Sequence, residues 1–170
     1  MIDLTRLTSI ELLTLHARIA EELRGRAIAR TSNNPTGDLA EYLFCQAFGW
    51  KPAGNSKANI DAIARDGTRY QIKGRRITRH TKSRQLSAIR DLAGRHFDYL
   101  AGVLFTEEYR ILRAALIPYA IVEQRAKFVE HTNSHKFILH DDVWTAPGVR
   151  DVTQKLTETA RSLEAQHGAA

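Results

Sequence analysis

A carboxylate, an amide and a lysine occur in the sequence at spacings that fit a single chemical site. Asp61 lies among the apolar residues of the stretch 59–63, where a carboxylate has no packing role. Gln71 and Lys73 follow across a turn, two positions apart, so they project from the same face of a strand. Facing side chains of adjacent antiparallel strands are about 5 Å apart. We therefore expect Asp61, Gln71 and Lys73 to converge, with Glu41 on a neighbouring helix supplying a further oxygen.

These side chains suit the binding of a hard divalent cation. Oxygen ligands of this kind favour Mg²⁺, which keeps several of its waters, and Mn²⁺ is expected to substitute for it. Such an ion polarises a phosphodiester and lowers the pKa of a bound water, which is what hydrolysis requires. Lys73 beside the metal would orient that water or stabilise the negative charge that develops on the phosphate. The chemistry indicated is therefore metal-dependent phosphodiester hydrolysis.

The segments 37–41, 59–63 and 70–73 resemble the signature of the PD-(D/E)xK nuclease superfamily, with Gln71-Ile72-Lys73 as a variant of its last motif. The resemblance covers roughly residues 35–117. It implies the restriction-endonuclease-like fold, a central mixed sheet flanked by helices, and magnesium-dependent cleavage of DNA. The roles it implies are Asp61 as the main metal ligand, Gln71 as the second, the carbonyl of Ile72 as an additional ligand, Lys73 as the catalytic lysine, and Glu41 as the helix acid that binds metal directly or through water.

Two residues depart from the family pattern. Ile60 replaces a proline that has no chemical role, whereas Gln71 replaces an acid. An amide oxygen can coordinate a metal but carries no charge, so metal affinity is expected to be weaker. Taken singly, Glu41, Gln71 and Lys73 are also compatible with ordinary surface side chains. A non-catalytic DNA-binding or interaction module that retained the nuclease fold is therefore the alternative to a restriction- or defence-type endonuclease.

The net charge of +6 is unevenly distributed along the chain. Residues 65–95 hold ten Lys and Arg against two Asp, which gives +8 there and leaves −2 for the rest. A basic stretch of this kind is typical of proteins that bind the phosphate backbone of DNA, although a solvated basic face or an acidic protein partner would share it. The residues predicted to contact DNA are Lys57, Arg75, Arg76, Arg79, Lys82 and Arg84.

Apolar periodicity and turn signals predict the elements that position these residues. Helices are expected at 8–30, 36–48, 118–126 and 151–166, and strands at 59–65, 68–73, 99–106, 109–117 and 136–139. Asp66-Gly67 predicts a hairpin turn, and Gly49 predicts the end of the second helix. The basic segment 78–95 is expected to be partly helical. This order predicts an α/β fold: a restriction-endonuclease-like core with a central mixed sheet flanked by helices, and an extra N-terminal helix.

We expect a single domain over 1–170, divided into an N-terminal helical extension (1–31), the nuclease-like core (35–117), and C-terminal helices with an additional strand (118–170). The apolar stripe of the first helix must pack on the core or on a second subunit. We expect a homodimer, because matched sites can then face opposite DNA strands. A partner subunit of a defence system is a further candidate. One cysteine, Cys45, no apolar run of about 20 residues and no secretory pattern at the start predict a cytoplasmic protein without a membrane segment.

Overall fold

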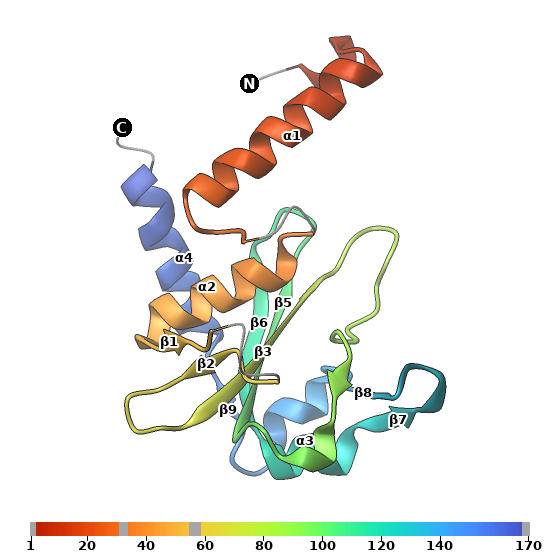
Figure 1. The fold of residues 1–170 in the computed structure, drawn as a ribbon, viewed down its shortest axis with the longest axis vertical. Helices are drawn as coiled ribbons and strands as arrows, with labels where there is room; N and C mark the ends of the chain where they lie inside the picture. Colours follow the sequence, from red (N-terminus) through yellow and green to blue (C-terminus); the bar gives the residue numbers. More distant parts are fainter. Residues whose placement is uncertain (1–2, 31–33, 55–58, 168–170) are drawn as a thin grey trace.

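A mixed six-stranded sheet forms the centre of the molecule (Figure 1). The computed structural model describes residues 3–30, 34–54 and 59–167. The strands of this sheet are β1 (Lys51–Pro52), β2 (Ala62–Ile63), β3 (Arg69–Arg76), β5 (Tyr99–Phe105), β6 (Ile111–Pro118) and β9 (Arg150–Asp151). They follow one another across the sheet in that order. β3 and β5 are parallel, and the other neighbouring strands are antiparallel.

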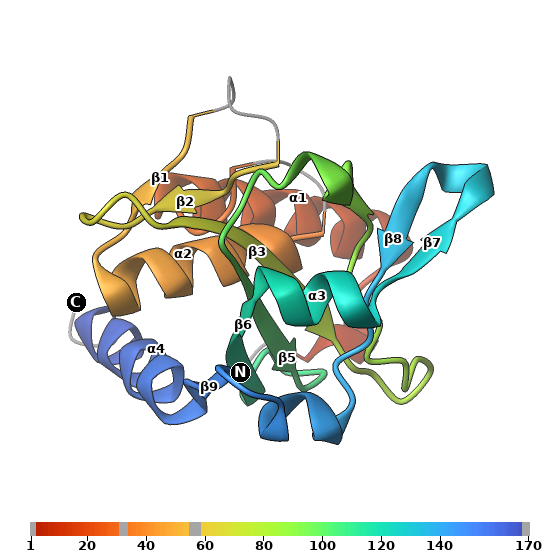
Figure 2. The same ribbon diagram turned by 90° about the horizontal axis from the view of Figure 1, so that it is seen from below.

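Helices and a smaller sheet cover the two faces of the central sheet (Figure 2). One face is covered by α2 (Thr36–Phe48) and α4 (Thr153–His167). The other is covered by α3 (Tyr119–Arg125) and by a sheet of β4 (Ile89–Arg90), β8 (Ser134–Lys136) and β7 (Lys127–Val129). Short 3-10 helices lie at Leu4–Arg6, Leu92–Gly94, Glu130–Thr132 and Asp141–Thr145. The predicted α/β class, with a mixed central sheet flanked by helices, is confirmed.

The central sheet separates two apolar cores. Alternate residues of β5 enter the two cores, because successive side chains of a strand point to opposite faces. Val103 packs beneath α2 and α4 with Phe44 and Leu156, whereas Leu104 packs on the other side with Phe137. A strand buried on both faces must be apolar on both, which explains the uninterrupted apolar sequence of β5.

The N-terminal helix, α1 (Ser9–Gly25), ends earlier than the predicted 8–30. The N–H of Ile28 donates to the carbonyl of Leu23 (3.0 Å), and Ala27 adopts a left-handed φ of 55°. These are features of a Schellman-type helix stop. The residue types do not predict this stop, because alanine occupies the left-handed position where glycine is usual. Like every other helix in the described ranges, α1 lacks the length and apolar character needed to cross a membrane.

The second half of the chain contains a small sheet that was predicted only in part. The segment 78–95 is mostly not helical, because its backbone pairs with a distant segment: the N–H of Leu86 donates to the carbonyl of Phe137 (2.9 Å). The strand predicted at 136–139 lies earlier, as β8, and its hairpin partner β7 was not predicted. Strands of three residues or fewer are too short for apolar alternation to identify them.

α2 lies directly against β3 at Gly74. A Cβ atom at this position would be 2.8 Å from the carbonyl oxygen of Thr36 and 3.0 Å from the Cβ of Ala40. Gly74→Ala is therefore expected to lower the free energy of unfolding, measured in urea, by about 1–3 kcal/mol, as overpacking does. Gly37→Ala is the matched control, because a Cβ there meets no atom within 4 Å. Equal losses in the two variants would contradict this close approach.

Candidate active site

β3 carries two of the predicted site residues on one face. Its register with the parallel strand β5 places Gln71 beside Leu100 and Lys73 beside Gly102. Leu100 belongs to the core on the side of α3, so Gln71 and Lys73 face that side of the sheet. The intervening Ile72 packs in the other core, with α2. The two polar side chains therefore share a face, as their spacing predicts.

A charged pair fixes the start of β3 against β5. The carboxylate of Asp98 accepts hydrogen bonds from the backbone N–H of Arg69 (2.8 Å) and from its guanidinium (2.9 and 3.1 Å). These hydrogen bonds hold the pKa of Asp98 below its usual value, so the carboxylate remains ionised at neutral pH. The pair therefore helps to set the register that positions Gln71 and Lys73.

Asp61 lies immediately before β2, and not in the middle of a strand as predicted. The strand predicted at 59–65 is shorter in the structure. It begins only at Ala62, and Asn59 before it takes a left-handed φ of 66°. The N–H of Asp61 donates to the carbonyl of Tyr70 (2.9 Å), and its Oδ2 accepts the N–H of Ile72 (2.6 Å). The N–H and C=O of one strand residue point to the same edge, so the carbonyl of Ile72 lies at this edge with the carboxylate.

Lys73 lies at the same edge as Asp61. Its Nζ is 3.8 Å from Oδ2 of Asp61, and the two side chains are 19% and 22% exposed. Because both groups are largely shielded from solvent, salt screens their attraction less than that of a surface pair. The ammonium group is thus held where its protons can be donated to a molecule bound beside Asp61.

Gln71 is a polar residue of β3 that is buried, with a hydrogen-bond acceptor that the described residues leave unsatisfied. The residue is 3% exposed, and its side-chain Oε1 is buried with no hydrogen-bond partner among the described residues. Burying an amide oxygen without a donor costs free energy, so such atoms are rare in folded proteins. In the same described ranges, the other buried side-chain atom of this kind is Nδ1 of His135. Gln71 lies two residues before Lys73 on the same face of β3, so its unsatisfied oxygen indicates a site for a ligand.

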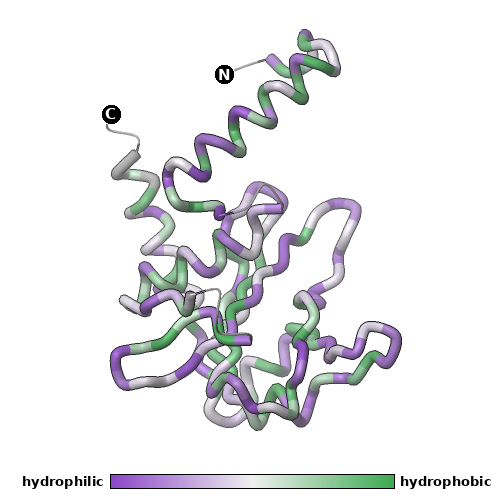
Figure 3. The backbone as a smooth tube through the Cα atoms, viewed as in Figure 1, coloured by the Kyte–Doolittle hydropathy of each residue, from purple (hydrophilic) through white to green (hydrophobic). Residues whose placement is uncertain are grey.

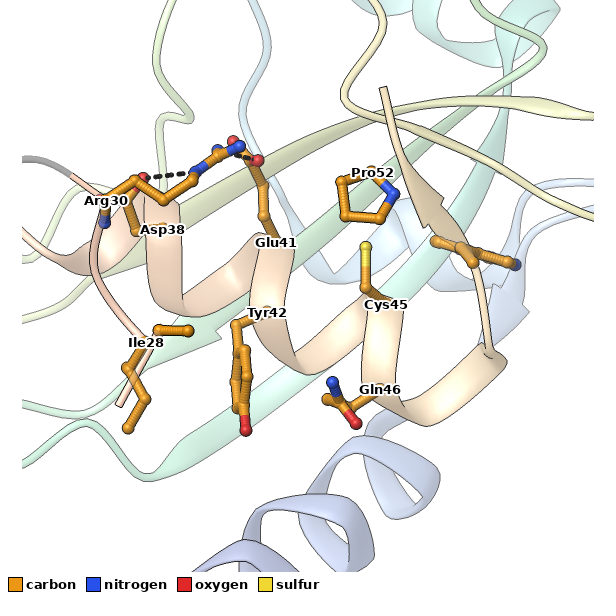
Figure 4. A pocket seen from close by; sticks show the side chains of 10 residues that line it. Ile28, Arg30, Asp38, Glu41, Tyr42, Cys45, Gln46 and Pro52 are labelled. Carbon is orange, nitrogen blue, oxygen red and sulfur yellow. Dashed lines mark hydrogen bonds and ion pairs between the residues drawn. The ribbon is translucent and has the colours of Figure 1, made fainter. Parts of the chain in front are cut away.

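Glu41 approaches the site from α2, but an arginine binds its carboxylate. Arg30 forms an ion pair with Glu41, and its Nε lies 3.6 Å from Oδ1 of Asp38 (Figure 4). Burial raises the pKa of Glu41 and the negative charge of Asp61 raises it further, whereas Arg30 lowers it. The influence of Asp61 indicates that the two carboxylates are near each other. Arg30 was not predicted as a site residue, because its contact depends on the turn that follows α1.

A pocket of about 290 Å³ opens beside Glu41, between α2, the segment after α1 and the chain entering β1 (Figure 4). Arg30 and Glu41 supply its charged groups, and Tyr42 and Trp50 supply aromatic wall. Burial raises the pKa of Cys45, which also lines it, to about 11. This thiol therefore stays protonated at neutral pH and is not a nucleophile. The pocket adds space, but no second reactive group, next to the acids.

The oxygen atoms at this edge fit a hard divalent ion. Within the described ranges, no three His, Cys, Asp or Glu side chains gather into a metal-binding group. A bound ion would therefore be held by Asp61, the amide oxygen of Gln71 and the carbonyl of Ile72, with Glu41 as a fourth candidate. Mg²⁺ accepts mixed oxygen ligands and keeps several waters, so it suits a site with few carboxylates. The unsatisfied Oε1 of Gln71 is the observation that supports this fit.

The Arg30 contact leads to a testable pH dependence. A carboxyl whose pKa is raised by folding makes the chain lose stability as pH rises from the unfolded pKa through the folded one. Because Arg30 lowers the pKa of Glu41, Arg30→Gln should extend this loss to higher pH. The free energy of unfolding of Arg30→Gln, measured without metal between about pH 4 and pH 7, should therefore fall further below that of the native chain as the pH rises.

The control for this prediction removes the titrating carboxyl. In a Glu41→Gln background, the further change Arg30→Gln should produce a stability difference that does not vary with pH over the same range. A double-mutant cycle at each pH isolates the interaction of the two side chains. A pH-dependent difference that persists without Glu41 would assign the effect to another acid, such as Asp38.

The residues predicted to contact DNA do not form one continuous row. Lys57 lies outside the described residues. Arg75 and Arg76 are consecutive in β3 and point to opposite faces of the sheet. The Nε of Arg75 donates to the carbonyl of Ser83 (3.2 Å), whereas the guanidinium of Arg76 lies 4.8 Å from the centre of the Tyr109 ring. Of these two residues, Arg75 is therefore the one on the face of Gln71 and Lys73.

The other three predicted residues lie in the loop between β3 and β4. Arg79 is 3.9 Å from Glu107, Arg84 is 2.7 Å from Asp141, and Lys82 is exposed. Exposed ion pairs contribute little stability, so these arginines can exchange a carboxylate for a phosphate at small cost. The loop remains a candidate phosphate-binding surface, next to but separate from the edge of β3.

A second cationic surface was missed from the sequence. In the hairpin of β7 and β8, Lys127 lies directly opposite Lys136, and neither forms an ion pair within the described part of the chain. Like charges at paired positions disfavour a sheet. Phe128, which follows Lys127 in β7 and pairs with His135, is 57% exposed. This hairpin combines an exposed aromatic ring with two lysines that form no ion pair within the described residues, and of its two strands only β8 was predicted, at 136–139.

No protein-family model matches the chain, and no curated protein matches its sequence significantly. The function is therefore inferred from the residues and their geometry.

Proposed function

We propose that this chain is a divalent-metal-dependent endonuclease that hydrolyses DNA phosphodiesters, with a PD-(D/E)xK type of site on a restriction-endonuclease-like core. One observation carries the proposal. The Oε1 of Gln71 is buried without a hydrogen-bond partner among the described residues, and Gln71 shares a face of β3 with Lys73, whose ammonium contacts Asp61. An amide oxygen in this position is costly for the free chain and is accounted for by a cation that binds there.

The metal would be held by Asp61, the Oε1 of Gln71 and the carbonyl of Ile72, with Mg²⁺ as the expected ion and Mn²⁺ as its substitute. When bound, such an ion polarises the phosphodiester and lowers the pKa of the attacking water. Arg30 already neutralises the carboxylate of Glu41, so we assign Glu41 a contribution through water. An amide supplies no charge, so millimolar rather than tight metal binding is expected.

Lys73 and Asp61 act together in this proposal. Asp61 keeps the ammonium of Lys73 within 3.8 Å of its carboxylate, so that the lysine is already oriented before substrate binds. Lys73 then donates a hydrogen bond to the attacking water or to a phosphoryl oxygen, and its charge stabilises the negative charge that develops there. Because the ammonium is held in advance, little reorganisation is needed during the reaction.

The substrate class is inferred from charge. Residues 65–95 carry +8, and the loop between β3 and β4 presents Arg79, Lys82 and Arg84 beside the strand that bears the site. Cations in this position suit the phosphates that flank a scissile bond. Within nucleases, a restriction- or defence-type endonuclease is the proposed role, in the cytoplasm, with DNA as the partner.

A second candidate function is a non-catalytic DNA-binding or interaction module. Two observations favour it: Gln71 brings no charge to the site, and the carboxylate of Glu41 already forms an ion pair with Arg30. Such a module would bind DNA but would bind Mg²⁺ or Mn²⁺ negligibly. Titration of the chain with metal, monitored by calorimetry, therefore separates the two candidates without requiring the correct DNA substrate.

The deciding experiment incubates supercoiled plasmid with the chain and Mg²⁺ or Mn²⁺, with EDTA as the control. Nicked and linear products that require metal support the nuclease. Binding that weakens steeply as salt rises, without cutting, favours the non-catalytic DNA-binding module, because release of counterions makes phosphate binding salt-dependent. Binding that is absent or insensitive to salt favours an interaction subunit of a larger system.

A further inference from the structure

The hairpin of β7 and β8 forms one wall of a pocket that the candidate active site does not use. The hairpin projects from the body of the molecule (Figures 1 and 2), and most of its residues are hydrophilic (Figure 3). The pocket has a volume of about 420 Å³ and lies where the hairpin follows the end of α3. Its polar lining residues are Arg125, Lys127, Lys136, His140 and Asp142.

Lys127 and Lys136 extend from the same face of the hairpin. They are directly opposite each other in its antiparallel register, and Cβ atoms at such positions are about 5 Å apart. Phe137, the residue after Lys136, enters the core on the side of α3, so Lys136 points away from that core. Phe128 pairs with His135 on the other face of the hairpin. The two lysines therefore face the pocket together, and the exposed ring of Phe128 lies outside it.

The charges of this pocket are unbalanced. The Nη1 of Arg125 donates to Oδ2 of Asp142 (2.7 Å), so this cation already has an anionic partner. In the part of the chain that the structure describes, neither Lys127 nor Lys136 forms an ion pair. With His140 neutral, the pocket carries +2. Like charges at facing positions destabilise a sheet, so an anion with two negative charges, bound between the two ammonium groups, would remove this repulsion.

We infer that this pocket binds a small organic phosphate monoester, of the size of a nucleotide or a sugar phosphate, with its phosphate between Lys127 and Lys136. A phosphate monoester carries a charge of about −1.5 to −2 at pH 7 and so matches two ammonium groups, whereas a phosphodiester carries a single charge. The pocket falls within the range of roughly 300–1,000 Å³ that is typical of small-molecule sites, and Ile138 and Val143 offer apolar contact to the organic part. This site goes beyond the proposed nuclease function and does not depend on it.

Isothermal titration calorimetry of the full chain with adenosine 5′-monophosphate (AMP) and with ribose 5-phosphate tests the site. The buffer contains EDTA and no phosphate, so that no metal takes part. AMP should bind at least about tenfold more tightly than its cyclic 3′,5′-diester, which has the same base and sugar but less charge, and adenosine should not bind measurably. Equal affinity for AMP and the cyclic diester, or no binding of either AMP or ribose 5-phosphate, would overturn the inference.

Phosphate monoesters occur on free small molecules and at the ends of nucleic-acid strands, and competition with bound AMP distinguishes these two sources. The competitors are a 5′-phosphorylated dinucleotide and the same dinucleotide without the phosphate. Displacement of AMP by the phosphorylated form alone supports the site and identifies a strand end as its ligand. AMP that neither form displaces supports the site and identifies a free small molecule. Equal displacement by both forms would contradict recognition of the monoester.

Two substitutions locate the bound phosphate. Lys127→Gln and Lys136→Gln should each weaken AMP binding at least about tenfold, because each removes a charged hydrogen-bond donor. Lys82→Gln is the matched control: it removes the same charge from an exposed lysine outside the pocket, and should bind AMP as the native chain does. Without ligand, neither pocket variant should have a lower melting temperature, because each loses one of two repelling charges. Unchanged AMP affinity in both pocket variants, or an equal loss in Lys82→Gln, would refute the assignment.

Discussion

Asp61→Asn and Lys73→Ala are each expected to lower the rate of plasmid cleavage by at least about a hundredfold. Asparagine keeps an oxygen that can accept the N–H of Ile72, which is 2.6 Å from the Asp61 carboxylate, but it loses the charge that attracts a metal and Lys73. Lys73→Ala removes the ammonium that stabilises charge on the phosphate. The measurement is the initial rate of nicking at saturating Mg²⁺, with thermal unfolding of each variant to verify its fold.

Two further variants separate chemistry from structure and from DNA binding. Asp61→Ala leaves the N–H of Ile72 without its acceptor, so it should also lower the free energy of unfolding by about 1–3 kcal/mol, which Asp61→Asn should not. Lys82→Ala removes an exposed lysine of the loop before β4, and should weaken DNA binding while leaving the maximal rate nearly unchanged. Cleavage that survives both Asp61→Asn and Lys73→Ala would mean that other residues, or a contaminating nuclease, cut the plasmid.

Features with a local physical cause were predictable from the sequence. Gly49 ends α2 with a left-handed φ of 64°, and Gly67 takes a φ of 86° in the turn that joins β2 to β3, as the residue types predict. The shared face of Gln71 and Lys73 follows from the two-residue period of a strand. Each of these conclusions depends on a few neighbouring residues and on rules that tertiary contacts rarely override.

Features that depend on distant contacts were not predictable. The pairing of Arg30 with Glu41 requires the helix stop at Ala27, where alanine adopts a conformation that usually selects glycine. A strand was predicted through 59–65, but before Ala62 the side chain of Asp61, rather than a backbone carbonyl, accepts the N–H of Ile72. Neither contact has a sequence signal, because each is formed between segments whose relative placement is known only once the fold is known.

Gln71→Met is expected to have two opposite effects on the metal-free chain. It should raise the free energy of unfolding by about 1–3 kcal/mol, because methionine fills a similar volume and removes a buried amide oxygen that has no hydrogen-bond partner in the described part of the chain. It should also reduce cleavage at least about a hundredfold, because the site loses one metal ligand. The two measurements are denaturation in urea with EDTA and the nicking rate at saturating Mg²⁺. A stabilising substitution that abolishes activity is typical of a residue retained for function.

Two further measurements test whether the effect of Gln71 comes from metal binding: the change in melting temperature on adding Mg²⁺, and the behaviour of Gln71→Glu. Mg²⁺ should raise the melting temperature of the native chain but not that of Gln71→Met, because a ligand stabilises only the state that binds it. Gln71→Glu places a second carboxylate beside Asp61, so without metal it should destabilise the chain through repulsion, and with metal it should lower the Mg²⁺ concentration needed for half-maximal stabilisation. If Gln71→Met instead destabilises the chain and leaves its response to Mg²⁺ unchanged, Gln71 is a packing residue, and the non-catalytic module becomes the better account of this site.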